Sequence, residues 1–121
     1  MRETLIAKHS FDLEERTLNF AKNIIRLCKH LPQVIINSEL TAQLIRASGS
    51  VGANYREAND ALSRKDFSYR IKISRKEAKE SHYWLELLQE ANPEYKEDIG
   101  KLLNESIELK KIFSAIVDKS C

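Results

Sequence analysis

The sequence predicts an all-α protein, an antiparallel up-down-up-down four-helix bundle formed by a single domain of residues 1–121. Three observations support this fold class. Apolar side chains recur at three- and four-residue spacing along most of the chain. Only three glycines and two prolines occur among 121 residues, so few residues remain for turns. The connections between the periodic segments are short, which favours antiparallel packing of consecutive helices.

The first helix is expected to begin near Asp12, with Asp12 as the N-cap and Glu15 three residues later as its capping-box partner. It should end before Pro32, because the residue ahead of a proline is disfavoured in the helical region. Residues 32–37 should then form a loop packed against the bundle. The apolar positions of this helix cover about half of its circumference. They are Leu18, Ala21, Ile25 and Cys28, flanked by Phe20, Ile24, Leu27 and Leu31.

The second helix is expected to begin at Asn37 or Ser38, either of which is a good N-cap. Its apolar seam consists of Leu40, Leu44, Ala47, Val51, Asn54, Tyr55, Ala58 and Leu62. Residues 47–53 are small and include two glycines, each costing about 1 kcal/mol relative to alanine in a helix. We interpret this run as a place where another helix approaches closely, and a helix break there is the alternative. A phosphate-binding loop is excluded, because no strand precedes the run and no Gly-Lys follows it.

The third helix should be capped by Ser63 with Asp66 and should extend to about residue 91. One narrow stripe suits packing inside the monomer: Phe67, Ile71, Ser74, Ala78, Ser81, Leu85 and Leu88. A second stripe lies about a quarter-turn away: Ile73, Glu77, Glu80, Trp84 and Leu87. Either the core is simply wide here, or a second copy of the chain covers this stripe. The apolar excess favours self-association, with Ile73, Trp84 and Leu87 at the oligomer interface.

The third face of this helix is basic. It carries Lys65, Lys72, Arg75, Lys76 and Lys79, with Tyr69 and Tyr83 alongside. Seven basic and two acidic residues occur from position 64 to 79, although the net charge of the chain is only +2. Like charges four residues apart repel each other, so a solvated face normally mixes signs. Three interpretations of this face are open: neutralisation within the assembly by the acids of residues 94–108, binding of RNA, DNA or another polyanion, and no role.

Asn92 and Pro93 predict the end of the third helix and the start of the fourth, with Asn92 as N-cap and Pro93 at the first helical position. The apolar side of the fourth helix consists of Ile99, Leu102, Leu103, Ser106, Leu109, Phe113, Ile116 and Val117.

The polar residues near the apolar seams predict an inter-helix network and no catalytic site. The network residues are Asn54, Glu57, Glu77 and Glu80, with Arg46, Arg56 or backbone groups as partners. Glu77 and Glu80 lack the histidine of di-iron pairs, and His9, His30 and His82 are scattered, so no metal is expected. No nucleophile lies at helical spacing from a base, and we expect no enzyme activity, cofactor or small-molecule substrate.

Two cysteines, Cys28 and Cys121, argue against a disulfide framework. No apolar run is long enough for a signal peptide or a membrane span. A cytoplasmic protein is therefore expected.

Two segments carry a family resemblance. Residues 43–58, Gln-Leu-Ile-Arg-Ala-Ser-Gly-Ser-Val-Gly-Ala-Asn-Tyr-Arg-Glu-Ala, resemble the second-helix signature of four-helix-bundle proteins encoded in intervening sequences of bacterial 23S ribosomal RNA genes. Lys65-Asp-Phe67 and residues 76–88 resemble the third-helix signature of the subgroup with Trp-Leu near the end of that helix. The likeness extends from Phe11 to about Val117.

The resemblance implies a ring-like homopentamer whose function is unsettled for most members. A related branch, the accessory proteins of diversity-generating retroelements, forms basic pentamers that bind nucleic acid and a reverse transcriptase. By position, the resemblance places Asn54, Glu57, Glu77 and Glu80 at polar positions between helices, and Lys72, Arg75, Lys76 and Lys79 on a basic surface. The chain departs from that branch in its modest charge. A pure protein–protein scaffold is the alternative function.

Overall fold

The computed structural model describes residues 2–120, and the side chains of residues 12–119, as four helices. Helix α1 spans Arg2–His30, α2 spans Ile35–Asn59, α3 spans Arg64–Ala91 and α4 spans Lys96–Ser120. A short 3-10 helix, η1, occupies Pro93–Tyr95 between α3 and α4. This confirms the predicted all-α four-helix bundle.

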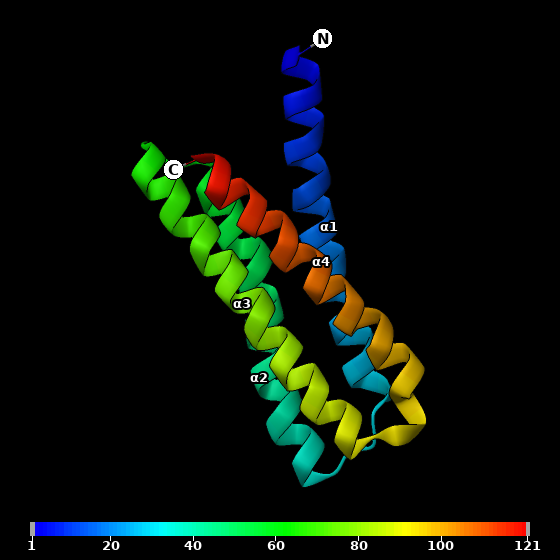
Figure 1. Cartoon of the computed structure of the whole chain (residues 1–121). Helices are drawn as coiled ribbons and strands as arrows, with labels where there is room; N and C mark the ends of the chain where they lie inside the picture. Colours follow the sequence, from blue (N-terminus) through cyan, green and yellow to red (C-terminus); the bar gives the residue numbers. More distant parts are fainter. Residues whose placement is uncertain (1, 121) are drawn as a thin grey trace.

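Consecutive helices pack side by side with short connections between them (Figure 1). The packing of α1 against α4 completes the bundle, and the α2–α3 and α3–α4 contacts are the most extensive. Helix α3 thus lies between α2 and α4, and only its outer face is open to solvent. None of the helices in residues 2–120 is long and apolar enough to cross a membrane.

The narrow stripe predicted on α3 forms the centre of the core. Ile71, Ala78, Leu85 and Leu88 are fully buried, and Phe67 is half-buried. Its serines are buried with their hydroxyls satisfied; for example, the Ser74 hydroxyl donates to the Val51 carbonyl oxygen at 2.9 Å. The predicted apolar sides of α2 and α4 are likewise mostly buried, except that Leu62 lies beyond the end of α2 and is fully exposed.

The small-residue run remains helical, so the alternative of a break there is wrong. One of its glycines permits the close approach of α1. A Cβ atom on Gly52 would lie 2.9 Å from Thr17 Oγ1, too close for an unstrained contact. Gly49 is different, because a Cβ atom there would meet nothing within 4 Å. The packing of α1 on α2 therefore explains why residue 52 is a glycine. Gly49 faces outward, away from this contact.

Three of the predicted helix starts are wrong. The first turn at Pro93 is the 3-10 helix η1 without a side-chain cap from Asn92, and α4 begins only at Lys96. Helix α1 begins at Arg2 rather than near Asp12, because residues 2–11 contain no proline or glycine that would end it. Helix α2 begins at Ile35, after Val34, and has no side-chain cap. The predicted cap residue, Asn37, is buried inside the first turns, where its side chain has other partners. The N-cap of α3 is confirmed, since the backbone N–H of Asp66 donates to Ser63 Oγ at 3.0 Å.

The buried face of α1 is centred on other residues than the sequence predicted. The residues expected to flank the stripe, Phe20, Ile24, Leu27 and Leu31, form the core. Leu18 and Ile25, expected at its centre, are exposed. The segment Val34, Ile35 and Ile36, expected to pack against the bundle, is also exposed, with Ile35 at 74%. The side chain of His9 and residue Cys121 lie outside the described residues.

Candidate functional site

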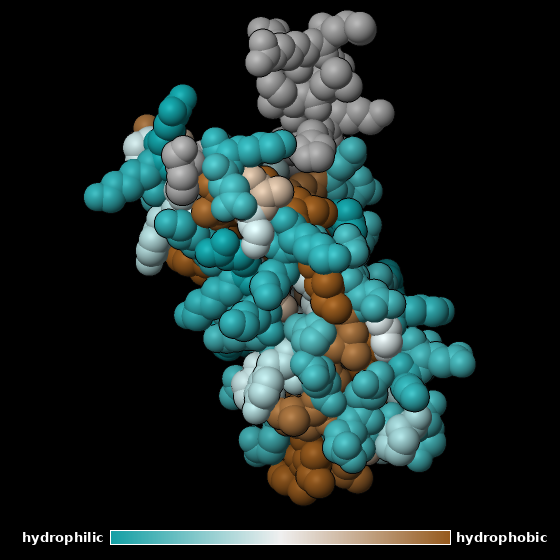
Figure 2. All heavy atoms as spheres, in the orientation of Figure 1, coloured by the Kyte–Doolittle hydropathy of each residue, from teal (hydrophilic) through white to brown (hydrophobic). Residues whose placement is uncertain are grey.

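A stripe of lysines and tyrosines runs along the solvent face of α3. Its members are spaced alternately by four and three residues, which aligns them along one side of the helix. They are Lys65, Tyr69, Lys72, Lys76, Lys79 and Tyr83, and all six are exposed. The stripe lies on the side opposite the buried Ile71–Ala78–Leu85 stripe and extends about 27 Å at 1.5 Å per residue. Hydrophilic side chains cover most of this part of the molecule in Figure 2.

The four lysines of this stripe form no ion pair with any side chain from residue 12 to 119. The predicted fifth basic residue, Arg75, is half-buried at the edge of the face and has no ion pair there either. Lys72 and Lys76 are four residues apart and repel each other, and the nearby charge of Lys76 is also one of the causes that lower the pKa of Glu80. The stripe is therefore a cationic surface without ion pairs among the described side chains.

The antiparallel packing of α3 and α4 places most acids of α4 away from this stripe, although Asp118 lines the groove beside Lys79. Residues 80–108 contain eight acids and two bases, and they occupy the end of the α3–α4 pair where η1 joins the helices. Glu105, farther along, is held by Arg16 of α1, with Arg16 Nε and Glu105 Oε2 2.8 Å apart. That bond is also the main reason why the pKa of Arg16 is raised. None of these acids forms an ion pair with a lysine of the stripe on α3, but Glu108 lies 3.9 Å from Lys111 of its own helix.

Opposite Lys79, α4 instead contributes two further lysines. Lys79, Lys110 and Lys111 lie around a groove of about 590 Å³ between α3 and α4. The groove is also lined by small and apolar side chains and by His82 and Asp118. Sequence reasoning missed Lys110 and Lys111, because their position depends on which part of α4 meets the basic half of α3. We call Lys65, Lys72, Lys76, Lys79, Lys110 and Lys111 the cationic surface.

Most of the predicted polar network joins α2 to α3. Arg46 of α2 donates to Glu77 at 3.0 Å and to Glu80 at 2.8 Å. The Glu77 side chain is only 7% exposed, whereas that of Arg46 is 55% exposed. Burial raises the pKa of Glu80, but hydrogen bonding to Arg46 and Glu77 outweighs burial, so this pKa lies below its ordinary value. Hydrogen bonds to Glu80 and Glu77 in turn raise the pKa of Arg46.

Asn54 belongs to a separate cluster. Its amide donates to the carbonyl and hydroxyl oxygens of Ser50, both at 2.9 Å, and its Oδ1 accepts from Arg70 at 3.3 Å. Glu57 is exposed and belongs to neither cluster. The two clusters hold α2 against α3 and include no lysine of the cationic surface, whose only ion pair among the described side chains joins Lys111 to Glu108.

The chain matches the family of 23S rRNA-intervening sequence proteins over residues 9–115. It belongs to that family. A crystal structure of a protein of unknown function from the S23 ribosomal protein family of Bacteroides thetaiotaomicron is similar to it, with 34% sequence identity and a TM-score of 0.76. The similarity covers 86% of this chain and 96% of that chain. No functionally curated protein matches the chain significantly.

In this intervening-sequence protein, the predicted interface residues Ile73, Trp84 and Leu87 are half-buried. Trp84 packs against the core, and its buried indole N–H has no hydrogen-bond partner among the described residues. Its ring meets that of Tyr83 edge-on, with centroids 5.1 Å apart. Trp84 therefore contributes to the monomer core and retains only part of its surface for a partner.

A second apolar surface lies on α1 and α2 of this family member, where the sequence alone indicated only an excess of apolar residues on α1. Leu18, Ile25 and Ile45 are exposed there, at 39%, 47% and 44%. Arg46 is the single charged residue from Leu40 to Tyr55, and it is bound to α3. The solvent side of α2 over this segment thus carries no free charge. Apolar surface is also visible at the lower end of Figure 2, where α2 begins.

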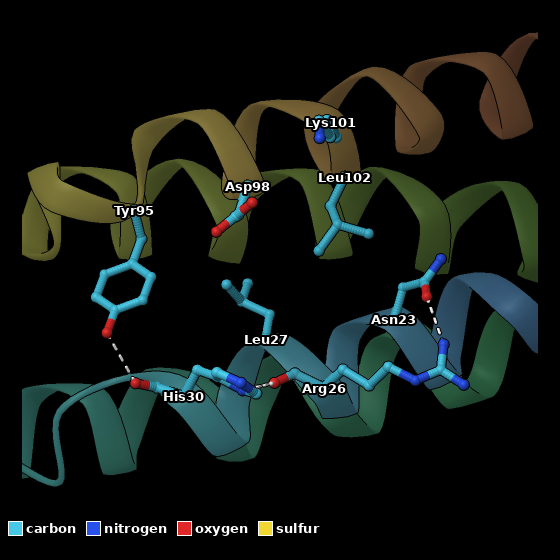
Figure 3. A pocket seen from close by; sticks show the side chains of 8 residues that line it. All are labelled: Asn23, Arg26, Leu27, His30, Tyr95, Asp98, Lys101 and Leu102. Atoms are coloured by element: carbon cyan, nitrogen blue, oxygen red, sulfur yellow. Dashed lines mark hydrogen bonds between the residues drawn. The ribbon is translucent and has the colours of Figure 1, made fainter.

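A hollow of about 400 Å³ between α1 and α4 contains a histidine and an aspartate (Figure 3). Several of its polar groups bond to neighbouring protein atoms: the Tyr95 hydroxyl donates to the His30 carbonyl at 2.9 Å, and His30 Nδ1 donates to the Arg26 carbonyl. Burial raises the pKa of the Cys28 thiol to about 11, so little of it is thiolate near neutral pH.

Within the described residues, no three histidine, cysteine or acidic side chains are placed to hold a metal ion.

Proposed function

We propose that this protein is a non-enzymatic, homo-oligomeric helical bundle that binds nucleic acid through the cationic surface of α3 and α4. The observation that carries the proposal is the line of four exposed lysines on α3 without ion-pair partners. Lys110 and Lys111 across the groove extend the same surface. A protein–protein scaffold without nucleic acid is the competing function, and the experiments below separate the two.

The proposed binding is electrostatic and independent of base sequence. A lysine that neutralises a phosphate releases condensed counterions, so affinity falls as salt rises. Each contact adds about 0.7–0.9 to the slope of log affinity against log salt. The modest net charge of +2 does not oppose this mechanism, because the potential at a surface depends on local charge.

Reversing two central lysines, Lys72→Glu and Lys76→Glu together, is expected to weaken oligonucleotide binding about a hundredfold at about 50 mM salt and to lower the salt slope by about two units. Both side chains are exposed, so the fold should be unaffected. Fluorescence anisotropy of labelled oligonucleotides at several salt concentrations measures both quantities.

The matched control reverses Lys96 and Lys101 to Glu, which changes the net charge equally at the acidic end of α4. This variant should bind almost as well as the unaltered protein. Equal losses in the two variants would show that only net charge matters. No salt-sensitive binding by the unaltered protein at low salt would reject the nucleic-acid proposal and favour the scaffold.

Self-association is the second part of the proposal. A closed ring of identical subunits joins two different surfaces of each copy. The chain offers two: the α1–α2 surface with Leu18, Ile25 and Ile45, and the half-buried stripe with Ile73 and Trp84. We propose that these surfaces meet between neighbouring copies. The family resemblance favours five copies.

Light scattering after size exclusion should give a mass several times the 14.0 kDa of the chain at micromolar concentration. Ile25→Glu with Ile45→Glu should yield a folded monomer, because charge is introduced into the apolar contact and not into the core. Ile107→Glu, at a similarly exposed position in the α3–α4 groove, should leave the assembly intact. A monomeric unaltered protein would contradict self-association. Trp84→Ala is a poorer test, because Trp84 also supports the core.

A further inference from the structure

We infer that the cationic surface takes single-stranded nucleic acid, with unpaired bases stacked on the rings of Tyr69 and Tyr83. This inference rests on the proposed nucleic-acid function and specifies its ligand class. Single-stranded RNA and single-stranded DNA both have a flexible phosphate backbone with exposed bases, and this common chemistry defines the ligand class.

The exposure of the two tyrosines is the first argument. Tyr69 and Tyr83 are 59% and 56% exposed, although tyrosine rings usually bury most of their area. The other two tyrosines have evident structural roles: Tyr55 is buried against Phe113, and the Tyr95 hydroxyl bonds to the His30 carbonyl. The rings of Tyr69 and Tyr83 are thus unusually available to a planar ligand.

The spacing is the second argument. Tyr69 and Tyr83 are separated by fourteen residues, about 21 Å along the helix, and Lys72, Lys76 and Lys79 lie between them in the same stripe. Proteins that bind single strands combine a positively charged track for the phosphates with aromatic rings for the bases. The stripe on α3 has both components on one rigid element.

The surroundings of the rings are compatible with stacking. The planes of Tyr83 and Trp84 are 75° apart, so Trp84 does not stack in parallel on the Tyr83 ring. The Arg70 guanidinium lies 6.0 Å from the centroid of Tyr69 and is anchored by its hydrogen bond to Asn54. At that distance Arg70 steadies one face of Tyr69 by a cation–π contact. Tyr69 nevertheless remains 59% exposed, which leaves ring surface for a base.

The position of α3 argues against readout of duplex bases. A recognition helix must enter a major groove about 12 Å wide. Helix α3 contacts α2 on one side and α4 on the other, so only its outer face is accessible (Figure 1). The stripe also contains no arginine, the side chain that most often reads guanine. A duplex can therefore contact the lysines, but its paired bases are not free to stack on the tyrosine rings.

Competition between single strands and duplexes of the same length, about 20 nucleotides, tests the inference. The single strands are labelled oligo-dT and oligo-U, and the duplexes are DNA and RNA of mixed sequence. We expect the single strands to bind about tenfold more tightly than the duplexes. Tyr69→Ala with Tyr83→Ala should reduce single-strand affinity about a hundredfold and leave the salt slope and duplex binding unchanged.

The matched variant, Tyr69→Phe with Tyr83→Phe, keeps the rings and should bind single strands normally. Ultraviolet cross-linking to oligo-dT, mapped by mass spectrometry, should label Tyr69 and Tyr83 but not Tyr55 or Tyr95. If duplexes bind as tightly as single strands, or if the alanine variant binds normally, the stacking inference is overturned while the cationic surface stands. If nothing binds at low salt, the proposed function itself fails.

Discussion

Replacing Asn37 by alanine is expected to destabilise the bundle by about 3 kcal/mol, because buried polar groups lose their partners. Asn37 and Asn92 are each 3% exposed and exchange two hydrogen bonds, each amide nitrogen donating to the other's Oδ1 at 2.8 Å. The Asn37 amide also donates to the Pro32 carbonyl, and the Asn92 amide to the Leu88 carbonyl, both at 2.9 Å. The alanine variant leaves the Asn92 Oδ1 and the Pro32 carbonyl without these donors. Urea unfolding followed by circular dichroism measures the loss.

A double-mutant cycle separates this pair from a general packing effect. Asn92→Ala alone should lower the free energy of unfolding about as much as Asn37→Ala. The double variant should lose about 2 kcal/mol less than the sum of the two single losses, because either change alone already breaks the pair. Asn23→Ala, at an exposed asparagine of α1, should change stability by less than about 0.5 kcal/mol. Strict additivity of the two alanine variants would contradict a coupled pair.

Replacing Arg46 by methionine is expected to destabilise the protein by about 2 kcal/mol, because the Glu77 carboxylate stays buried without its cation. The loss should be smaller than for a fully buried pair, since the Arg46 side chain is half in water. Arg56→Met is the matched control. Arg56 is on the same helix, is also 55% exposed, and lies 3.8 Å from Glu14, a looser and more exposed partner. Its replacement should cost less than about 0.5 kcal/mol.

The pH dependence of the Arg46 variant gives an independent check. The pKa of Glu80 is lower in the folded protein than its ordinary value of 4.5. Its contribution to stability is therefore present above that value and is lost as pH falls through the lowered pKa. Without Arg46, this acid-side loss should be weaker, so the difference in stability between the variant and the unaltered protein should narrow as pH falls through the lowered pKa of Glu80. Parallel curves over this range would show that Arg46 does not hold the carboxyls.

The fold was predictable where local signals agreed with one another. On α3, the Ser63 cap and the spacing of Ile71, Ala78 and Leu85 all indicated the same helix and the same buried side. The solvent stripe followed from the same periodicity. These features depend only on residues close in sequence, which is why they could be read without tertiary contacts.

The errors arose where a distant residue decides the outcome. Asn37 has the composition of a helix cap, yet its partner, Asn92, is 55 positions away, and the helix begins two residues earlier without a side-chain cap. The groove with Lys110 and Lys111 likewise depends on the register between α3 and α4. A count of acids on α4 suggested neutralisation of α3, but antiparallel packing places most of those acids at the other end.

The separation of charge along α3 and α4 gives each subunit an electric dipole that runs from the η1 end to the basic end. In a ring of identical subunits, the component of this dipole along the ring axis is the same in every copy. The components perpendicular to the axis cancel when they are summed over all copies. The total dipole of a cyclic assembly is therefore the sum of the axial components of its subunits. In the proposed ring, the two rims would differ in sign, and a polyanion approaching from solution would be oriented toward the positive rim before it touched any lysine.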